Sequence, residues 1–159
     1  MYTSYSLLKI MRILADSYGM KITVTSKLNG VWGEYDYHNK VIRINKNIYE
    51  DFDIFKMTLF HEIAHMILDH RGKLKKLHRG TYYRSKNREL AARRAVLDEI
   101  KVDKYSRYLQ KRITGILTVS ISYGGVDNNE VRDEPALDHY IQSTIRSWEH
   151  YDGIISNQE

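Results

Sequence analysis

The sequence predicts an α+β fold in which helices surround a small antiparallel sheet. Apolar residues recur at helical spacing in several long segments, and a short stretch between them alternates as strands do and contains turn residues. The chain has 159 residues, of which 42% are hydrophobic and 28% are charged. One hydrophobic core can be built from this composition, so we expect a single domain over residues 1–159.

The first third of the chain is predicted to form a helix followed by the sheet. Ser4 is expected to cap the helix and Gly19 to end it, because Ser is a common N-cap and Gly a common helix stop. The predicted elements are a helix over 4–18, a strand over 22–25, and a hairpin whose strands cover 31–37 and 41–45.

The rest of the chain is predicted to be mainly helical. Residues 51–70 are apolar almost all round, which is typical of a buried helix. A loop over 71–86 joins this helix to a second long one over 87–112. Residues 113–159 are expected to form a C-terminal extension, with a short strand and a terminal helix whose first turn holds Pro135.

The run His61-Glu62-Ile63-Ala64-His65 has the HExxH pattern. Histidines four residues apart project from one helical face, so both imidazoles can bind one metal ion. Glu62 lies about 100° round the helix from His61, where it can reach a water held by the metal and act as general base. Because the chain has no cysteine, thiolate metal sites and cysteine nucleophiles are excluded. We therefore expect a catalytic Zn²⁺ site.

A catalytic zinc site needs a third protein ligand. Glu99 and Asp103 are the only acidic residues in a stripe of small and apolar residues on the helix over 87–112. Buried carboxylates need a cation or hydrogen-bond donors, so we assign Glu99 as the third ligand. Asp103 is expected to accept a hydrogen bond from a ligand histidine, although an ordinary ion pair with an arginine remains open. Asp98 and Glu89 are the alternative third ligands.

Three stretches around these residues resemble a known family. They are GMKITV, GVWGEYDYHNKVIRINKN and TLFHEIAHMILDH, and they are similar to the ImmA/IrrE family of small zinc metallopeptidases. That family also carries E-x-x-A-[DN]-x-F-A on a following helix, of which Glu99 to Ser106 looks like a degraded copy. The resemblance covers roughly residues 5–110. It implies a minimal zincin-like metallopeptidase domain, gluzincin-like in its ligands, in which Glu62 is catalytic and His61, His65 and Glu99 bind Zn²⁺.

The resemblance also implies a substrate. Members of the family cleave a regulatory protein, often a helix-turn-helix transcriptional repressor encoded beside the protease on a phage or mobile element. We therefore expect the partner to be such a repressor and the role to be in transcription regulation. Two alternatives remain open: a non-proteolytic binding protein on a zincin frame, such as an antirepressor or host-defence inhibitor, and a DNA-associated protease similar to the SprT group.

Positive charge is concentrated between the two predicted ligand helices. Residues 71–94 contain ten Lys or Arg and one acidic residue, a net charge of +9 against +5 for the whole chain. Such a segment can bind an acidic protein or nucleic acid, or can simply keep the protein soluble. The candidate contacts are Lys75, Lys76, Arg79, Tyr82 and Tyr83. The rings of the two tyrosines suit stacking on nucleic-acid bases.

The N-terminal stretch lacks an uninterrupted apolar run. Lys9, Arg12 and Asp16 break residues 2–20, so this stretch does not have the apolar centre of a signal peptide. No other run approaches the ~18 apolar residues that a spanning helix needs. We therefore expect a cytoplasmic protein without a membrane partner.

Overall fold

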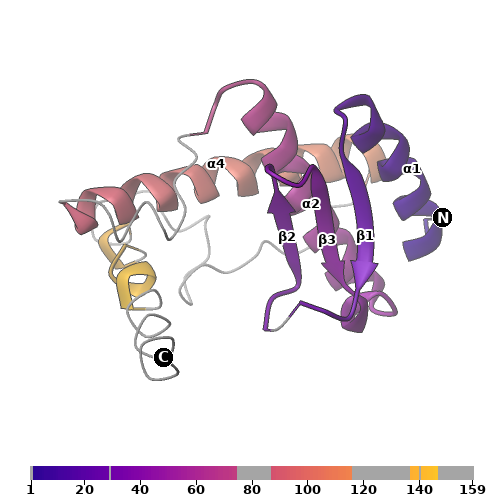
Figure 1. The fold of residues 1–159 in the computed structure, drawn as a ribbon, viewed down its shortest axis with the longest axis horizontal. Coiled ribbons are helices and arrows are strands. Elements are labelled where there is room, and N and C mark those ends of the chain that lie inside the picture. The colour runs from indigo at the N-terminus through magenta and orange to yellow at the C-terminus, as the bar shows by residue number, and fades with distance from the viewer. Residues whose placement is uncertain (1, 29, 75–86, 116–136, 140, 147–159) are drawn as a thin grey trace. The chain divides into compact units, whose positions relative to one another are not determined.

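The computed structural model describes residues 2–28, 30–74, 87–115, 137–139 and 141–146, and the fold is α+β as predicted. The chain divides into two compact units, residues 1–73 with 102–120 and residues 74–101 with 121–159. The elements labelled in Figure 1 are α1 (Ser4–Ser17), β1 (Lys21–Thr25), β2 (Gly33–Asp36), β3 (Val41–Asn45), α2 (Phe52–His70) and α4 (Arg88–Thr114). A 3₁₀ turn, η1 (Lys46–Ile48), lies between β3 and α2 in sequence.

Helix α1 begins with a capping box. The Thr3 hydroxyl accepts a hydrogen bond from the backbone N–H of Ser6, and the Ser6 hydroxyl accepts one from the backbone N–H of Thr3. The prediction of Ser4 as the N-cap is therefore wrong by one residue, because Thr3 has the extended backbone and the partner three residues on. Gly19 follows the helix with φ of +72°, which confirms it as the stop.

The sheet is mixed, with the strand order β1-β3-β2. The hairpin prediction is confirmed, since β2 pairs with β3 in antiparallel fashion across a turn over residues 37–40. The prediction of a purely antiparallel sheet is wrong, because β1 pairs with β3 in parallel. Strand β3 lies between the other two in Figure 1, and its Ile42 and Ile44 are fully buried. This apolar strand takes the centre, so β1 joins its far edge instead of pairing with β2.

Helix α2 lies at the core of its unit, as its sequence predicts. Asp51 caps it by accepting a hydrogen bond from the backbone N–H of Ile54 at 3.2 Å. The helix packs against α1, β2, β3 and η1. Contact on several sides explains why its apolar residues cover more than one face. Its fully buried side chains include Phe55, Leu59, Phe60, Ile63 and Met66.

Helix α4 is continuous across the boundary between the two units. Its first half belongs to the second unit, where its small apolar residues form a core with the described part of the terminal helix. The members are Ala91, Ala92, Val96, Ile100, Leu137 and Ile141. Residues 137–139 and 141–146 are helical, within the predicted terminal helix. The strand over 116–122, most of the loop over 71–86 and the rest of the extension lie outside the described residues.

None of the helices in the described part of the chain combines the length and apolarity needed to cross a bilayer.

Candidate metal site

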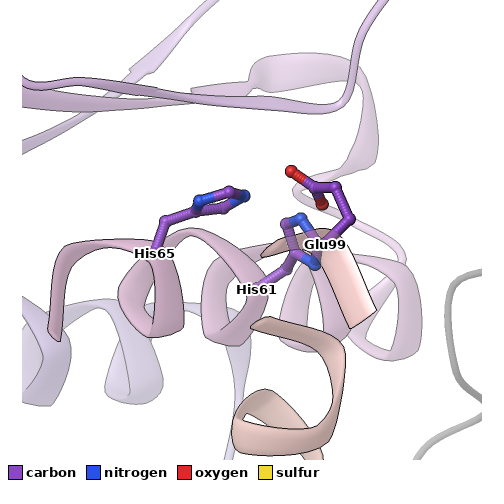
Figure 2. A group of neighbouring side chains, drawn as sticks. All are labelled: His61, His65 and Glu99. Atoms are coloured by element: carbon purple, nitrogen blue, oxygen red, sulfur yellow. The ribbon is translucent and has the colours of Figure 1, made fainter. Parts of the chain in front are cut away.

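His61 and His65 lie one turn apart on α2 and project on the same side of it (Figure 2). Their ring centroids are 5.0 Å apart and the ring planes are inclined by 72°. Both side chains are partly buried. The geometry is the one that the four-residue spacing predicts, with both imidazole rings on one face of the helix.

Glu99 of α4 completes a group of three donors with these histidines. One ring nitrogen of each histidine and one carboxylate oxygen of Glu99 all lie within 4.8 Å of one another, and Figure 2 shows the three side chains together. Donors around one tetrahedral zinc ion are about 3.4 Å apart, so these three atoms would need to approach one another by up to about 1.4 Å to bind one ion. Two imidazoles and one carboxylate form a donor set that suits zinc. The group could therefore hold a metal ion.

The alternative carboxylates do not join this group. Asp98 is buried and Glu89 is exposed, and neither belongs to the cluster of His, Asp and Glu donors found among the described residues. Of the three acidic residues considered for the third ligand, Glu99 is the one whose carboxylate reaches both histidines.

Glu62 is buried, with 7% of its surface exposed, and lies against the first residue of strand β2. A Cβ atom added at Gly33 would lie 3.1 Å from Cγ and 3.2 Å from Oε1 of Glu62, and only 2.7 Å from Cγ2 of Thr58. The backbone of β2 can thus approach Glu62 closely only because residue 33 has no side chain. Sequence analysis did not single out Gly33, although a glycine within a strand often marks such an approach.

Tyr35 lies two residues after Gly33, on the same face of β2, and connects the sheet to α2. Its ring is nearly parallel to that of His65, with an interplanar angle of 11° and centroids 6.1 Å apart. Its hydroxyl donates a hydrogen bond to Oδ2 of Asp69 at 2.7 Å. Burial, and then this bond to Asp69, raise the pKa of the Tyr35 hydroxyl. Tyr35 therefore stays a hydrogen-bond donor at neutral pH, with its ring beside that of His65.

Asp69 and Tyr35 were both missed by sequence analysis. Asp69 lies one turn beyond His65 on α2 and is buried. Its position next to the end of the helix resembles that of an ordinary polar residue in a last turn. Only the packing of β2 on α2 brings a hydroxyl 34 residues away in sequence to this carboxylate.

Asp103 is buried on α4, as predicted, and its Oδ2 lies 3.3 Å from Nε of Arg107. This is the ion pair with an arginine that the sequence left open. A hydrogen bond from a ligand histidine to Asp103 stays a prediction. The five candidate contacts of the basic segment lie outside the described residues: Lys75, Lys76, Arg79, Tyr82 and Tyr83.

A comparison of the chain with protein-family models, with curated proteins and with solved structures finds no match. The resemblance to the ImmA/IrrE family therefore stays a prediction from its motifs.

Proposed function

We propose that the protein is a zinc-dependent metallopeptidase with a zincin-like active site. The observation that supports this proposal best is the meeting of His61, His65 and Glu99 donor atoms within 4.8 Å. Glu62, the residue that the HExxH pattern assigns as general base, is buried next to His61 on the same helix. The motifs shared with the ImmA/IrrE family support the same activity.

In the proposed mechanism, His61, His65 and Glu99 hold the metal. Zinc, when bound, supplies Lewis acidity, which makes a water easier to deprotonate and polarises the carbonyl of the scissile peptide. The Glu62 carboxylate takes a proton from the attacking water while the oxygen of that water bonds to the carbonyl carbon. The same carboxyl group then gives that proton to the departing amine as the C–N bond breaks, so Glu62 ends the cycle ionised.

Two neighbours hold this machinery in place. The backbone at Gly33 limits the space open to the Glu62 side chain, and the stacked ring of Tyr35 limits rotation of His65. Restricting a base and a ligand in advance lowers the entropy lost on reaching the reactive geometry. The substrate we propose is a cytoplasmic regulatory protein, such as a helix-turn-helix repressor of a phage or mobile element, because the resembling family cleaves such proteins.

The metal site is tested first by elemental analysis of the purified protein, which we expect to contain one zinc per chain. Glu99→Gln should weaken zinc binding by at least about 100-fold, since even partners that only orient a ligand contribute 10- to 100-fold. Asp98→Asn is the matched control, one residue earlier on α4, and should leave zinc affinity unchanged. Equal losses in the two variants would contradict Glu99 as the ligand.

The activity is tested with the zinc-loaded protein on a library of cell-derived peptides, with products identified by mass spectrometry. A helix-turn-helix repressor, co-expressed with the protein, serves as a folded substrate. We expect Glu62→Gln to abolish cleavage and to retain one zinc per chain, because Glu62 moves protons and does not bind the metal. If Glu62→Gln retains the biological activity of the wild type, the protein acts by binding and the proteolytic proposal is wrong.

A further inference from the structure

Two tyrosines stack on the half of α4 that belongs to the first unit. The rings of Tyr105 and Tyr108 have centroids 5.8 Å apart and an interplanar angle of 29°. The guanidinium carbon of Arg71, just after α2, lies 5.6 Å from the centroid of the Tyr105 ring. Tyr108 is 53% exposed. We call these three residues the tyrosine platform: a row of flat groups that is open to solvent at Tyr108.

The stretch of α4 that carries the two tyrosines is positively charged. Lys104 and Arg112 are exposed and lie four residues before and after Tyr108, so the three residues follow one ridge of the helix. Asp103 is the only acidic residue between positions 102 and 115, and it is buried and paired with Arg107. No exposed carboxylate of this stretch therefore offsets the cations beside Tyr108.

Flat rings and flanking cations together favour one kind of partner. Nucleobases stack on exposed aromatic rings, and the phosphates between them pair with Lys and Arg. An acidic peptide would use the cations but would leave the stacked rings without a matching flat group. Lys104 and Arg112 each lie about 6 Å along the helix axis from Tyr108, one on each side of the ring.

We propose that the tyrosine platform binds single-stranded nucleic acid, with a base stacked on Tyr108 and neighbouring phosphates paired with Lys104 and Arg112. This interaction goes beyond the proposed peptidase function, because none of its residues binds the metal or moves a proton. Binding should therefore be the same with and without zinc, and the same in Glu62→Gln.

The test is fluorescence anisotropy of a labelled oligo(dT) of about 15 nucleotides, a length within the range that single-strand binding surfaces cover, titrated with the full chain. Tyr108→Ala should weaken binding about tenfold or more through lost stacking, and Tyr108→Phe should bind as the wild type does. The matched control is Tyr5→Ala on α1, because Tyr5 is 69% exposed but belongs to no ring stack of the described residues. That variant should keep wild-type affinity.

The ionic part is tested by the salt dependence of the same titration. Removing both cations in Lys104→Ala/Arg112→Ala should reduce the slope of log affinity against log salt by about 1.4, or 0.7 for each phosphate contact. Lys9→Ala, an exposed lysine on α1, should leave the slope unchanged. Circular dichroism checks that each variant is folded.

Three results would overturn the proposal. The first is an absence of oligo(dT) binding at low salt. The second is wild-type affinity in folded Tyr108→Ala, which would assign any binding to another part of the chain. The third is equally tight binding of polyglutamate, which would show that the surface recognises negative charge alone, as a docking site for acidic proteins does.

Discussion

Strand β2 places its alternate residues in two different environments. Gly33 and Tyr35 face α2, where the first packs against Glu62 and the second lies over His65. Glu34 and Asp36 face the other way, as successive strand residues must. Both pair with Arg43 of β3, with N–O distances of 3.3 and 2.9 Å.

The two faces of this four-residue edge strand therefore differ in their contacts: one packs on the candidate site, and the other carries charges. The inner face has close, partly buried contacts with the proposed base, Glu62, and with a proposed metal ligand, His65. The outer face carries charged pairs, and charges on an edge strand discourage pairing with other chains. If this division is correct, substitutions at neighbouring positions should have effects of different kind: chemistry and metal binding on the inner face, small changes of stability on the outer face.

The largest effect is expected for Gly33→Ala. The added Cβ would lie 2.7 Å from Cγ2 of Thr58, whose side chain is buried, and within 3.2 Å of the Glu62 carboxylate. Because the Glu62 side chain must then move by a few tenths of an ångström, we expect peptide cleavage to fall by about tenfold or more, towards the roughly 100-fold that a 1 Å misplacement would cause. Zinc affinity should stay near the wild-type value, because the three atoms nearest to the added Cβ belong to Thr58 and Glu62, which are not proposed metal ligands. The peptide-library assay and a zinc titration measure the two effects.

A double variant separates overlap with Thr58 from displacement of Glu62. The overlap with Thr58 should also lower the free energy of unfolding of Gly33→Ala. In Gly33→Ala/Thr58→Ser the closest clashing atom, Cγ2, is absent, so part of that lost free energy should return. The contacts with Glu62 remain, so cleavage should stay low. Glu34→Ala, on the outer face of the same strand, is the matched control and should cleave as the wild type does. Full activity in Gly33→Ala would show that the close approach does not position Glu62.

The second effect is expected at Tyr35. Tyr35→Phe removes the hydroxyl that donates to Asp69 but keeps the ring. A buried carboxylate that loses a donor costs about 1–3 kcal/mol, so we expect a loss of unfolding free energy in this range with little change in zinc affinity. Tyr35→Leu also removes the ring that lies over His65, and zinc affinity should then fall about tenfold.

Denaturant unfolding and zinc titration distinguish the two roles of Tyr35. Tyr5→Phe, at a hydroxyl on the exposed surface of α1, controls for the loss of a tyrosine hydroxyl. If Tyr35→Leu binds zinc as tightly as Tyr35→Phe does, the ring does not hold His65 in place.

Part of the fold and of the candidate site can be predicted from the sequence alone. Local periodicity is enough to place His61 and His65 on one face and to mark α2 as buried, because a helix relates residues four positions apart whatever surrounds them. Glu99 is predictable for a similar reason, as an acidic residue among small and apolar residues on its helix. Helix ends are less certain, as Thr3 in place of Ser4 shows, because either residue can cap.

Contacts between distant elements were the part that periodicity could not supply. The alternation of β1 and β3 tells which residues face the core, but it does not tell which strands become neighbours. The parallel pairing of β1 with β3 and the roles of Gly33 and Tyr35 all depend on such neighbours. Gly33 offered a signal, since glycine in a strand suggests a close approach, whereas nothing local to Tyr35 points to Asp69.

The third effect, on the outer face, is expected to be small. Arg43→Ala removes the ion pairs with Glu34 and Asp36, and exposed or partly exposed pairs contribute about 0.2–1 kcal/mol. We expect a loss of unfolding free energy within that range, reduced further in 1 M salt by screening, and unchanged zinc affinity and cleavage. A fall in zinc affinity as large as that of Tyr35→Leu would contradict the separation of the two faces of β2.

The smallest effect concerns acid pH. Hydrogen bonds from Asn39, and then the Arg43 guanidinium, lower the pKa of Asp36 from 3.8 to about 2. The Asp36 carboxyl therefore binds a proton more weakly in the folded chain than in the unfolded chain. Its ionised form stabilises the folded chain above pH 4, and this contribution to the free energy of unfolding is lost as the pH falls towards 2. Because Asp36 lies near the surface, we expect the loss to be below about 1 kcal/mol.

An NMR titration of the Asp36 carboxyl group in the full chain follows this proton directly. The side chain of Asn39 is the largest cause of the lowered pKa, and its Nδ2 donates to Asp36 at 2.7 Å. Asn39→Ala should consequently raise the pKa of Asp36 more than Arg43→Ala does. The reverse order would mean that the ion pair across the strands, and not the turn that joins them, controls the charge of Asp36.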